Sequence, residues 1–388
     1  YFDDISLKLK RNKGLILQEH PLLPKINLKI KDEDYVSLEE KRLSAIESGV
    51  LVTSSDDWIK TKISWNDKSK KAKIRLKGDW TDHLYGQKFS LRVNISKGKT
   101  LGAYSKFSIQ NPVSRHYIDE WFIHKILQKE DVLTTRYEFA DLYINQEIRG
   151  LYAIEEHFTP ELLMSQGRKV GPIFKYTEDD LWYDRYIHNK HQTKGVPWYP
   201  GAIIEVFSQD KVLEDPNLIE EFFRGRDLMY QFKFKLGAAT SIVDVEKMAS
   251  NLALMDLCAG YHSVIWHNQR FYYNAEKDLL EPLVYDIFQE SSRLKKDPMI
   301  FLGWQYVEKP NSYKVSTLDF LFQDQSFVEW YIHYLEKYSQ PDFFDSFETS
   351  LQDDIDLYES EIQKEYDYYS FDLGMYHERA ANIRSHLN

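Results

Sequence analysis

Cysteine, glycine and proline are scarce in this chain, and long hydrophobic runs are missing. The single cysteine, Cys258, excludes an intrachain disulfide and a cysteine-rich zinc site. Its apolar surroundings, LALMDLCAG, indicate a buried structural thiol. No apolar run approaches the ~20 residues that a transmembrane helix needs. With 16 glycines and 12 prolines in 388 residues, no segment has the low-complexity composition of a disordered chain. These absences indicate a folded globular protein.

An excess of positive charge is also missing. The chain has 50 basic and 61 acidic side chains, a formal net charge of −11. Such a surface repels nucleic acid backbones, so we expect no nucleic acid partner. The acidic run QDDIDLYESEIQKEYDYY near the C-terminus is typical of a solvated helix face. The chain starts at Tyr1, and a removed signal peptide or a membrane anchor outside this sequence is compatible with that start.

Apolar residues are plentiful, and their spacing predicts the fold class. Hydrophobic residues make up 43% of the chain and aromatic residues 15%, enough for a large core in one big domain or two packed lobes. A period of two predicts strands in residues 58–76 and 88–96, and a hairpin in 134–158. Helical spacing appears in residues 115–130, 215–237 and 244–261, and in about three segments after residue 315. The order predicts an α+β protein with a sheet-rich first lobe and a helical second lobe.

Three segments carry polar residues that core packing alone does not explain. The first, RLKGDWTDHLYGQKFSLRV, places charges around a glycine-containing turn: Lys77, Asp79, Asp82, Lys88 and Arg92. They form either a binding site or the exposed faces of two strands and their connection. The second, GLYAIEEHF, ends an apolar strand with Glu155 and Glu156.

The third segment is HSVIWHNQRFYYN with the LVYDIF that follows it. Asn268 and Asp286 are separated by 18 residues, and a predicted hairpin between them returns the chain to its starting end. A carboxamide and a carboxylate that converge are typical Mg²⁺ ligands. Many phosphotransferases bind the phosphates of ATP with a lysine that forms an ion pair with a glutamate. A buried His-Asn pair that satisfies loop carbonyls is the structural alternative.

The segments KGDWTDHLYGQKFSLRV, LYINQEIRGLYAIEEHF and WHNQRFYYN…LEPLVYD together resemble the CotH family of spore-coat-type bacterial protein kinases. The resemblance covers roughly residues 73–286 and implies an atypical protein-kinase-like fold with two lobes, without a glycine-rich loop. It predicts an N-terminal extension (1–50) and a kinase-like domain (51–388), with a sheet-rich lobe at about 51–175 and a helical lobe at about 202–388.

The same resemblance implies ATP and Mg²⁺ as cofactors. By position, Lys88 matches the lysine on the ATP phosphates and Glu156 the glutamate that ends the hairpin, so we expect these two to form an ion pair. Lys77 and Arg92 complete the predicted nucleotide-binding set. Asn268 and Asp286 match the metal ligands.

One position departs from the family pattern. The family's catalytic aspartate falls five residues before the asparagine, where this chain has Ser263. The adjacent His262 is the predicted base, because an imidazole titrates near neutral pH. His262 and Ser263 are therefore the predicted catalytic positions, and ordinary hydroxyl phosphorylation, adenylylation and glutamylation all stay open.

The leading prediction is an ATP- and Mg²⁺-dependent transferase that modifies a protein or a cell-envelope polymer, located in the envelope or outside the cytoplasm. A non-catalytic envelope binding or assembly protein (a pseudokinase) is the second. A glycoside-type hydrolase using Glu155, Glu156 and Asp79 ranks last, because adjacent strand residues point to opposite faces. The sequence does not indicate the acceptor or the oligomeric state.

Overall fold

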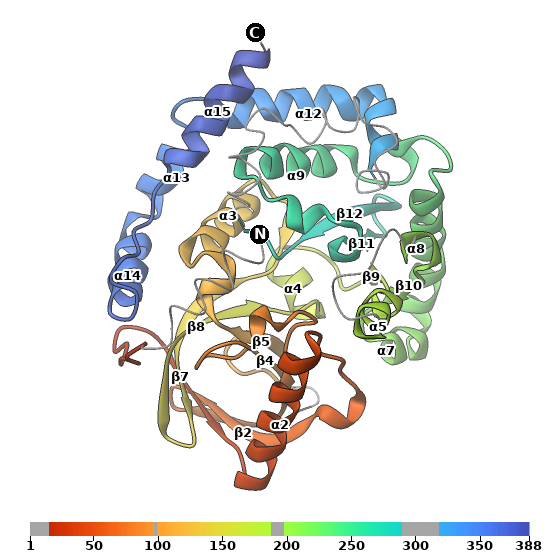
Figure 1. Cartoon of the computed structure of the whole chain (residues 1–388). Coiled ribbons are helices and arrows are strands. Elements are labelled where there is room, and N and C mark those ends of the chain that lie inside the picture. The colour runs from red at the N-terminus through yellow and green to blue at the C-terminus, as the bar shows by residue number, and fades with distance from the viewer. Residues whose placement is uncertain (1–14, 97–98, 188–197, 289–317, 388) are drawn as a thin grey trace.

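A closed barrel and a second, smaller sheet organise the molecule (Figure 1). The computed structural model describes residues 15–96, 99–187, 198–288 and 318–387. The predicted α+β class is confirmed. The sheet-rich part is a barrel in the order β1-β2-β3-β4-β5-β8-β7, closed where β7 pairs in parallel with β1. Its strands are β1 (Lys25–Lys29), β2 (Ile59–Trp65), β3 (Lys68–Leu76), β4 (Leu91–Ile95), β5 (Lys106–Gln110), β7 (Tyr137–Ile144) and β8 (Glu147–Glu156).

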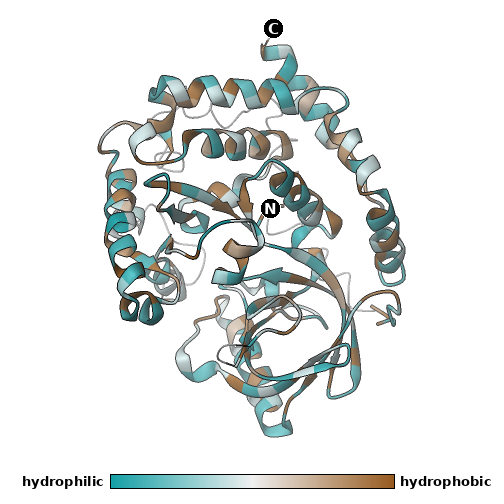
Figure 2. Ribbon diagram, turned by 180° about the vertical axis from the view of Figure 1, so that it is seen from behind, coloured by the Kyte–Doolittle hydropathy of each residue, from teal (hydrophilic) through white to brown (hydrophobic). Residues whose placement is uncertain are grey.

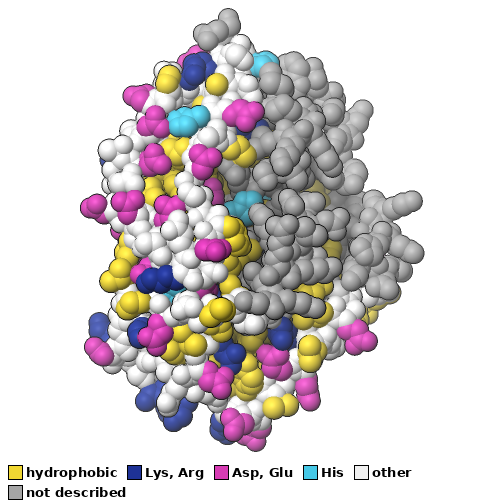
Figure 3. All heavy atoms as spheres, turned by 60° about the vertical axis from the view of Figure 1, so that its left-hand side comes forward, with side chains coloured by type: hydrophobic (Ala, Val, Ile, Leu, Met, Phe, Trp, Pro, Cys, Tyr) yellow, Lys and Arg dark blue, Asp and Glu magenta, His cyan; other side chains and the backbone are white. Residues whose placement is uncertain are grey.

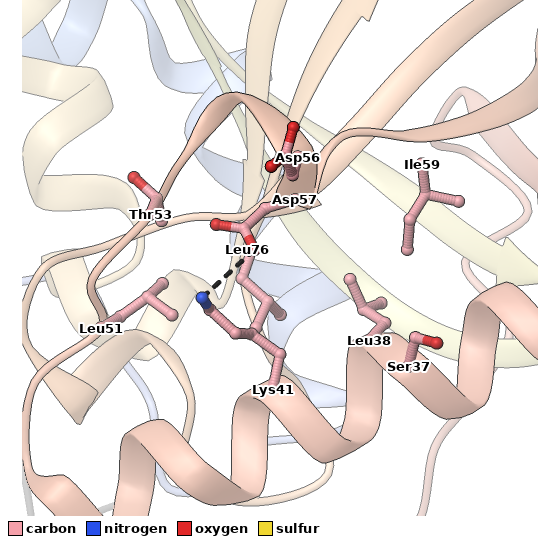
Figure 4. A pocket seen from close by; sticks show the side chains of 9 residues that line it. All are labelled: Ser37, Leu38, Lys41, Leu51, Thr53, Asp56, Asp57, Ile59 and Leu76. Atoms are coloured by element: carbon pink, nitrogen blue, oxygen red, sulfur yellow. Dashed lines mark ion pairs between the residues drawn. The ribbon is translucent and has the colours of Figure 1, made fainter.

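The first 50 residues, which we expected as an extension, supply part of this barrel. Strand β1 lies between β2 and β7, and helix α2 (Asp32–Ser48) packs on the barrel core through Leu38 and Ala45. Beside α2 lies a small pocket lined by Leu38, Leu51, Ile59 and Leu76, with the Lys41–Asp57 ion pair (3.1 Å) across it (Figure 4).

The two faces of the barrel wall have opposite chemistry. Ile74, Val93, Phe107, Ile109 and Ile154 fill the barrel interior. Because successive strand residues alternate between faces, the residues between them point outward. On β3, β4, β5 and β8 these outward residues are polar or charged. This outer polar face positions the candidate site.

The second sheet has the order β10-β9-β11-β12-β6. The predicted strands around residues 270 and 283 form its central hairpin, β11 (Arg270–Asn274) with β12 (Leu279–Val284). The other strands are β6 (Leu133–Thr134), β9 (Ile173–Tyr176) and β10 (Ile204–Val206). The predicted second lobe is therefore not purely helical, because this sheet runs through it.

Helices surround the second sheet and contribute most of the larger core. Cys258 is fully buried at the end of α9 (Val245–Cys258), as predicted, and apolar residues run through this helix (Figure 2). The helices are α3 (Ile118–Lys129), α4 (Pro160–Ser165), α5 (Asp179–Ile187), α6 (Trp198–Gly201), α7 (Gln209–Glu214), α8 (Pro216–Phe234), α9 (Val245–Cys258), α12 (Gln325–Tyr338), α13 (Phe343–Ser350), α14 (Gln352–Gln363) and α15 (Gly374–Leu387).

The acidic C-terminal run forms α14 and the segment after it. Asp353, Asp354 and Asp356 are exposed while Ile355 and Ile362 are buried, so the predicted solvated face is confirmed for the first turns of this helix. Glu361 and Glu365 depart from the prediction, because their side chains are buried. The side of the molecule that carries α13 and α14 shows many acidic side chains in Figure 3. In the described ranges, no helix has both the length and the apolar composition to cross a membrane.

Candidate functional site

A buried lysine–glutamate ion pair lies on the outer polar face of the barrel. Lys77 directly follows β3, and its Nζ donates to Glu155 Oε2 on β8 at 2.6 Å. The same Nζ donates to Gln110 Oε1 at the end of β5. Burial lowers the pKa of Lys77, and the charge of Glu155 opposes that shift. A buried ammonium of this kind needs its carboxylate partner to stay charged.

Asp286, directly after β12, is the most constrained residue of the site. Its φ is 58°, in the left-handed region that is uncommon for residues other than glycine. One carboxylate oxygen makes an ion pair with Arg115, and the other lies 3.0 Å from His262 Nε2. Burial acts to raise the pKa of Asp286, but Arg115 and His262 hold it well below its usual range. Asp286 is therefore ionised, and its strained backbone marks it as a functional candidate.

Arg115 is aimed at Asp286 by a tight turn. It ends the 3₁₀ helix η3 (Pro112–Arg115), and both residues that follow have positive φ, His116 at 53° and Tyr117 at 59°. His83 Nε2 lies 3.2 Å from an Arg115 nitrogen and must accept that hydrogen bond, because arginine only donates. His83 is therefore neutral, with its proton on Nδ1 toward Ser90 Oγ (3.1 Å). Burial, helped by Arg115, holds the pKa of His83 well below its ordinary value.

Gly78 makes room for this arrangement. Its φ is +102°, and a Cβ there would lie 2.6 Å from the His83 ring. Gly86, in the same connection, also has positive φ (+77°) but has open space around its Cβ position. Both glycines therefore adopt a backbone conformation that is unfavourable for other residues. Only at Gly78 would a side chain also clash with a neighbouring residue.

We predict that Gly78→Ala costs more stability than Gly86→Ala. In both variants the alanine must adopt an unfavourable positive φ. Only Gly78→Ala also pushes the His83 ring toward Arg115, and this overpacking lowers the free energy of unfolding by about 1–3 kcal/mol more. Chemical denaturation of the two variants measures the difference. Equal losses of unfolding free energy would mean that the space around His83 is not needed.

Two further carboxyl groups join Glu155 in the site, those of Asp82 and Glu120, and each lies 3.9 Å from a nitrogen of Arg115. Asp82, Glu120 and Glu155 each have one buried oxygen without a hydrogen-bond partner in the described part of the chain. Burial, with the charge of Glu155, raises the pKa of Glu120 well above its ordinary value, while Arg115 acts in the opposite direction. Burial also raises the pKa of Asp82. Buried, unpartnered carboxylate oxygens are the donors that a hard cation such as Mg²⁺ prefers.

A comparison with known protein families identifies the family of this chain. A family model described as CotH kinase protein matches residues 74–385, most of the chain. The chain belongs to the CotH kinase family. None of the curated proteins compared matches it. The resemblance stated from three short segments is thereby confirmed, and the match extends it over the helices that follow Asp286.

Three of the site residues predicted from the sequence come together: Asn268 and Asp286, at CotH metal-ligand positions, and His262, the predicted replacement base. His262 lies in the 3₁₀ helix η5 (Tyr261–Val264) and contacts Asp286 through its ring. Asn268 Nδ2 donates to the His262 carbonyl at 3.0 Å, and Asn268 Oδ1 accepts from Tyr285 at 3.1 Å. Asn268 and Asp286 thus converge on the His262 loop, and their sharing of one metal ion stays a prediction. Among described residues, no group of three or more His, Cys, Asp or Glu side chains forms a metal site.

Ser263, which stands at the CotH aspartate position, is not in this group. Its hydroxyl donates to the Gly260 carbonyl at 2.8 Å and lies 3.0 Å from Met255 Sδ. In the described part of the chain, the side chains that touch Asp286 are those of Arg115 and His262. The geometry therefore favours His262 over Ser263 as the group next to the reacting atoms.

The predicted Lys88–Glu156 ion pair is wrong. Lys88 is 2% exposed and is held by Glu365, the Leu151 carbonyl and two tyrosine rings. Glu156 pairs with Arg136, whose Nε donates to it at 2.8 Å. The lysine–glutamate pair of the site is instead Lys77–Glu155, since the alternation along β8 sends Glu155 outward and Glu156 the other way. Glu155 pairs with Lys77 and Glu156 pairs with Arg136. The two glutamates therefore do not face each other as the pair of catalytic carboxylates that the hydrolase alternative requires.

Sequence reasoning missed Arg115 and Glu120, and it considered Glu155 only for a hydrolase. Arg115 stands in QNPVSRHYIDEW, where Pro112 signals a turn before the helix. The turn could be expected, but two consecutive residues with positive φ leave no mark in the sequence. Glu120 lies in the first turn of α3, where an acidic residue is ordinarily explained by the helix dipole.

Proposed function

We propose that this CotH-family protein is an ATP- and Mg²⁺-dependent transferase with an atypical, two-lobed kinase-like arrangement. The observation that carries the proposal is the convergence of Lys77–Glu155 from the barrel with Asp286 and His262 from the second sheet and its loop. Asp286 Oδ2 lies 3.0 Å from His262 Nε2, and Lys77 Nζ lies 2.6 Å from Glu155 Oε2. The two pairs are close enough for their charges to interact, because after burial and nearer partners Asp286 contributes to the pKa shift of Lys77 and Lys77 to that of Asp286. A lysine–glutamate pair facing an aspartate is the arrangement that positions nucleotide phosphates and their metal.

The residues of the site fit Mg²⁺, because oxygen atoms dominate and several are unpartnered. Asp286 and Asn268 would hold the ion, which supplies positive charge to the nucleotide phosphates when bound. Lys77 binds phosphate oxygens while Glu155 keeps its ammonium charged and directed. Arg115, which forms an ion pair with Asp286, would be a second cation at the same phosphates.

His262 has the geometry of a base that Asp286 orients. With its Nε2 hydrogen toward the carboxylate, the imidazole keeps Nδ1 as the nitrogen that can accept a proton. The acceptor hydroxyl would lose its proton to that nitrogen as its oxygen bonds to a phosphorus atom of ATP. The bond from that phosphorus to its bridging oxygen would break at the same time, and ADP would leave in phosphorylation or pyrophosphate in adenylylation. The acceptor is proposed to be a protein or a cell-envelope polymer, and the location the envelope or outside the cytoplasm.

A second function, nucleotide-independent binding or assembly by a pseudokinase, is favoured by one observation. Both oxygens of Asp286 are already engaged by cationic or hydrogen-bonding side chains, and the CotH aspartate position holds Ser263. If Asp286 stays bound to Arg115 and His262, the site would stabilise the fold but would not bind metal or catalyse transfer.

The deciding experiment measures thermal stability with ATP, with Mg²⁺ and with both. A transferase is stabilised only by the two together, by about 2.7 kcal/mol at 100 times the dissociation constant. No stabilisation under any of the three conditions would support the pseudokinase. Incubation with ATP labelled at the α- or γ-phosphate then identifies the transferred group, because adenylylation retains the α label and phosphorylation the γ label.

A further inference from the structure

Five exposed lysines cover the outer wall of the barrel on strands β1, β2 and β3. In the cross-strand register, Lys62 on β2 stands directly opposite both Lys29 on β1 and Lys71 on β3. Two residues earlier on β2, Lys60 stands opposite Lys73 on β3. All five residues are exposed. We call this surface the lysine face.

The lysine face has no acidic residue of its own to neutralise it. Its three strands have the sequences KINLK, IKTKISW and KSKKAKIRL, without aspartate or glutamate. In the part of the chain that the structure describes, none of the five lysines makes an ion pair with a carboxylate within 4.0 Å. Like charges directly opposite each other in a sheet destabilise it. Their retention in a folded protein therefore indicates a role other than stability.

The lysine face is distinct from the candidate site. The outward residues nearer that site are Arg75 on β3 and Arg92 on β4, which stand opposite each other and are only partly exposed. Lys77 and Glu155 are buried. The five lysines thus lie outside the set predicted to bind nucleotide, and the candidate site leaves them without a function.

The five charges act together at physiological salt. Neighbouring strands lie about 4.8 Å apart, so the backbones of Lys29 and Lys71 are separated by about 10 Å. That distance is about one Debye length at 0.1 M salt, so the potentials of the five charges add. The chain as a whole has a net charge of −11. An anionic surface therefore attracts the lysine face and repels the acidic remainder, which orients the molecule.

The composition of the lysine face indicates the kind of anionic partner. Beside the lysines, the outward positions of β1 and β2 carry Asn27 and Ser64, and no large hydrophobic residue of the three strands is exposed. A protein interface typically has aromatic residues at its centre and is depleted of lysine there. Lysine is a hydrated point charge, whereas arginine is preferred for one precisely placed phosphate or carboxylate. A layer of anionic lipid headgroups fits this face best.

We propose that the lysine face binds the surface of a membrane that contains anionic lipids, with strands β1, β2 and β3 lying against the headgroups. Each lysine close to an anionic bilayer strengthens binding about fivefold, so the five together strengthen it by roughly three orders of magnitude. The contact is electrostatic and reversible, and it inserts no apolar side chain. It does not depend on transferase activity.

Co-sedimentation with lipid vesicles tests the proposal. The parent should bind vesicles of phosphatidylcholine with about one third phosphatidylglycerol, and should not bind vesicles of phosphatidylcholine alone. Binding should weaken as salt is raised from about 0.1 M to about 1 M, because the Debye length falls from about 10 Å to about 3 Å. Lys62→Gln and Lys71→Gln should each lower the partition coefficient about fivefold, and the double variant about 25-fold.

Two matched variants separate the position of a lysine from its charge. Lys129→Gln removes an exposed lysine at the end of α3, outside the lysine face, and should bind as the parent does. Lys62→Arg keeps the charge and should also bind as the parent does. Without vesicles, the double glutamine variant should melt at or above the temperature of the parent, because a repulsion between opposite strands is removed. Its loss of binding then does not come from unfolding.

Three results would overturn the proposal. The first is equal binding to neutral and anionic vesicles, or parent-like binding by the double glutamine variant. The second is tighter binding of soluble inorganic polyphosphate than of anionic vesicles at the same concentration of negative charge, which would assign the lysine face to an anionic polymer. The third is a salt-sensitive oligomer that disappears in the double variant, which would assign the face to the acidic helices of a second copy.

Discussion

Replacing Glu365 with alanine should lower the free energy of unfolding by about 3–5 kcal/mol, the cost of leaving buried charges without their partner. Glu365 follows α14, and its carboxylate meets Lys88 with one oxygen and His20 Nε2 with the other, at 3.1 Å. The second oxygen also accepts from the Leu151 amide at 3.1 Å. The three side chains are almost completely buried, so water cannot replace the lost carboxylate.

Urea denaturation of Glu365→Ala measures this loss, with Glu378→Ala as the control. Glu378 is exposed on α15, and its replacement should change stability by no more than about 0.5 kcal/mol. Burial acts to raise the pKa of Glu365, but His20 and Lys88 lower it below the ordinary 4.5. The contribution of this carboxylate is therefore present above pH 4.5 and is lost as the pH falls through its lowered pKa. A loss as small as that of Glu378→Ala would contradict the assignment.

Asp286→Asn should have the largest effect on activity, reducing transfer by roughly 10²–10³-fold, the scale for removing one preorganised electrostatic group. Asparagine tolerates the positive φ and keeps the side-chain shape, so the change removes the charge with little backbone strain. Loss of that charge leaves Arg115 and His262 without their counter-ion. Stabilisation by ATP with Mg²⁺ should also disappear.

Asp278→Asn is the matched control for this prediction. Asp278 also has positive φ, at 55°, and also pairs with an arginine, Arg224, at 2.7 Å, but this pair is exposed at the other end of the β11–β12 hairpin. Its variant should keep both transfer and the response to ATP with Mg²⁺. If Asp286→Asn keeps them too, Asp286 neither binds the metal nor orients His262.

The sequence predicts the parts of this fold that depend on local periodicity. The strand alternation, α3, α8, α9 and the β11–β12 hairpin follow from spacing of two or of 3.6 residues, and the meeting of Asn268 and Asp286 at the His262 loop follows from the hairpin. Closure of the barrel does not, because the parallel pairing of β1 with β7 joins segments more than a hundred residues apart. Such pairings are set by the packing of the whole chain.

The error in the lysine–glutamate pair has a similar cause. Lys77 and Lys88 stand at the two ends of the same connection, and Glu155 and Glu156 are adjacent, so a resemblance by position can select the wrong member of each pair. The direction of each side chain depends on strand register, and a shift of one residue reverses it. The partner of Lys88, Glu365, is 277 residues away in the sequence. A short sequence motif does not predict a contact over such a separation.

The Lys88–Glu365–His20 contact also constrains how the protein is made. During synthesis, His20 and Lys88 leave the ribosome well before Glu365, which follows His20 by 345 residues. Until then the barrel contains a buried lysine that lacks its counter-charge, and Gly150 leaves a space that the Glu365 carboxylate later fills. The nascent barrel should therefore stay loosely formed and dependent on chaperones until Glu365 has been synthesised. For the same reason, the barrel should not survive as an excised fragment, nor should it be exchangeable between relatives without the matching C-terminal helices.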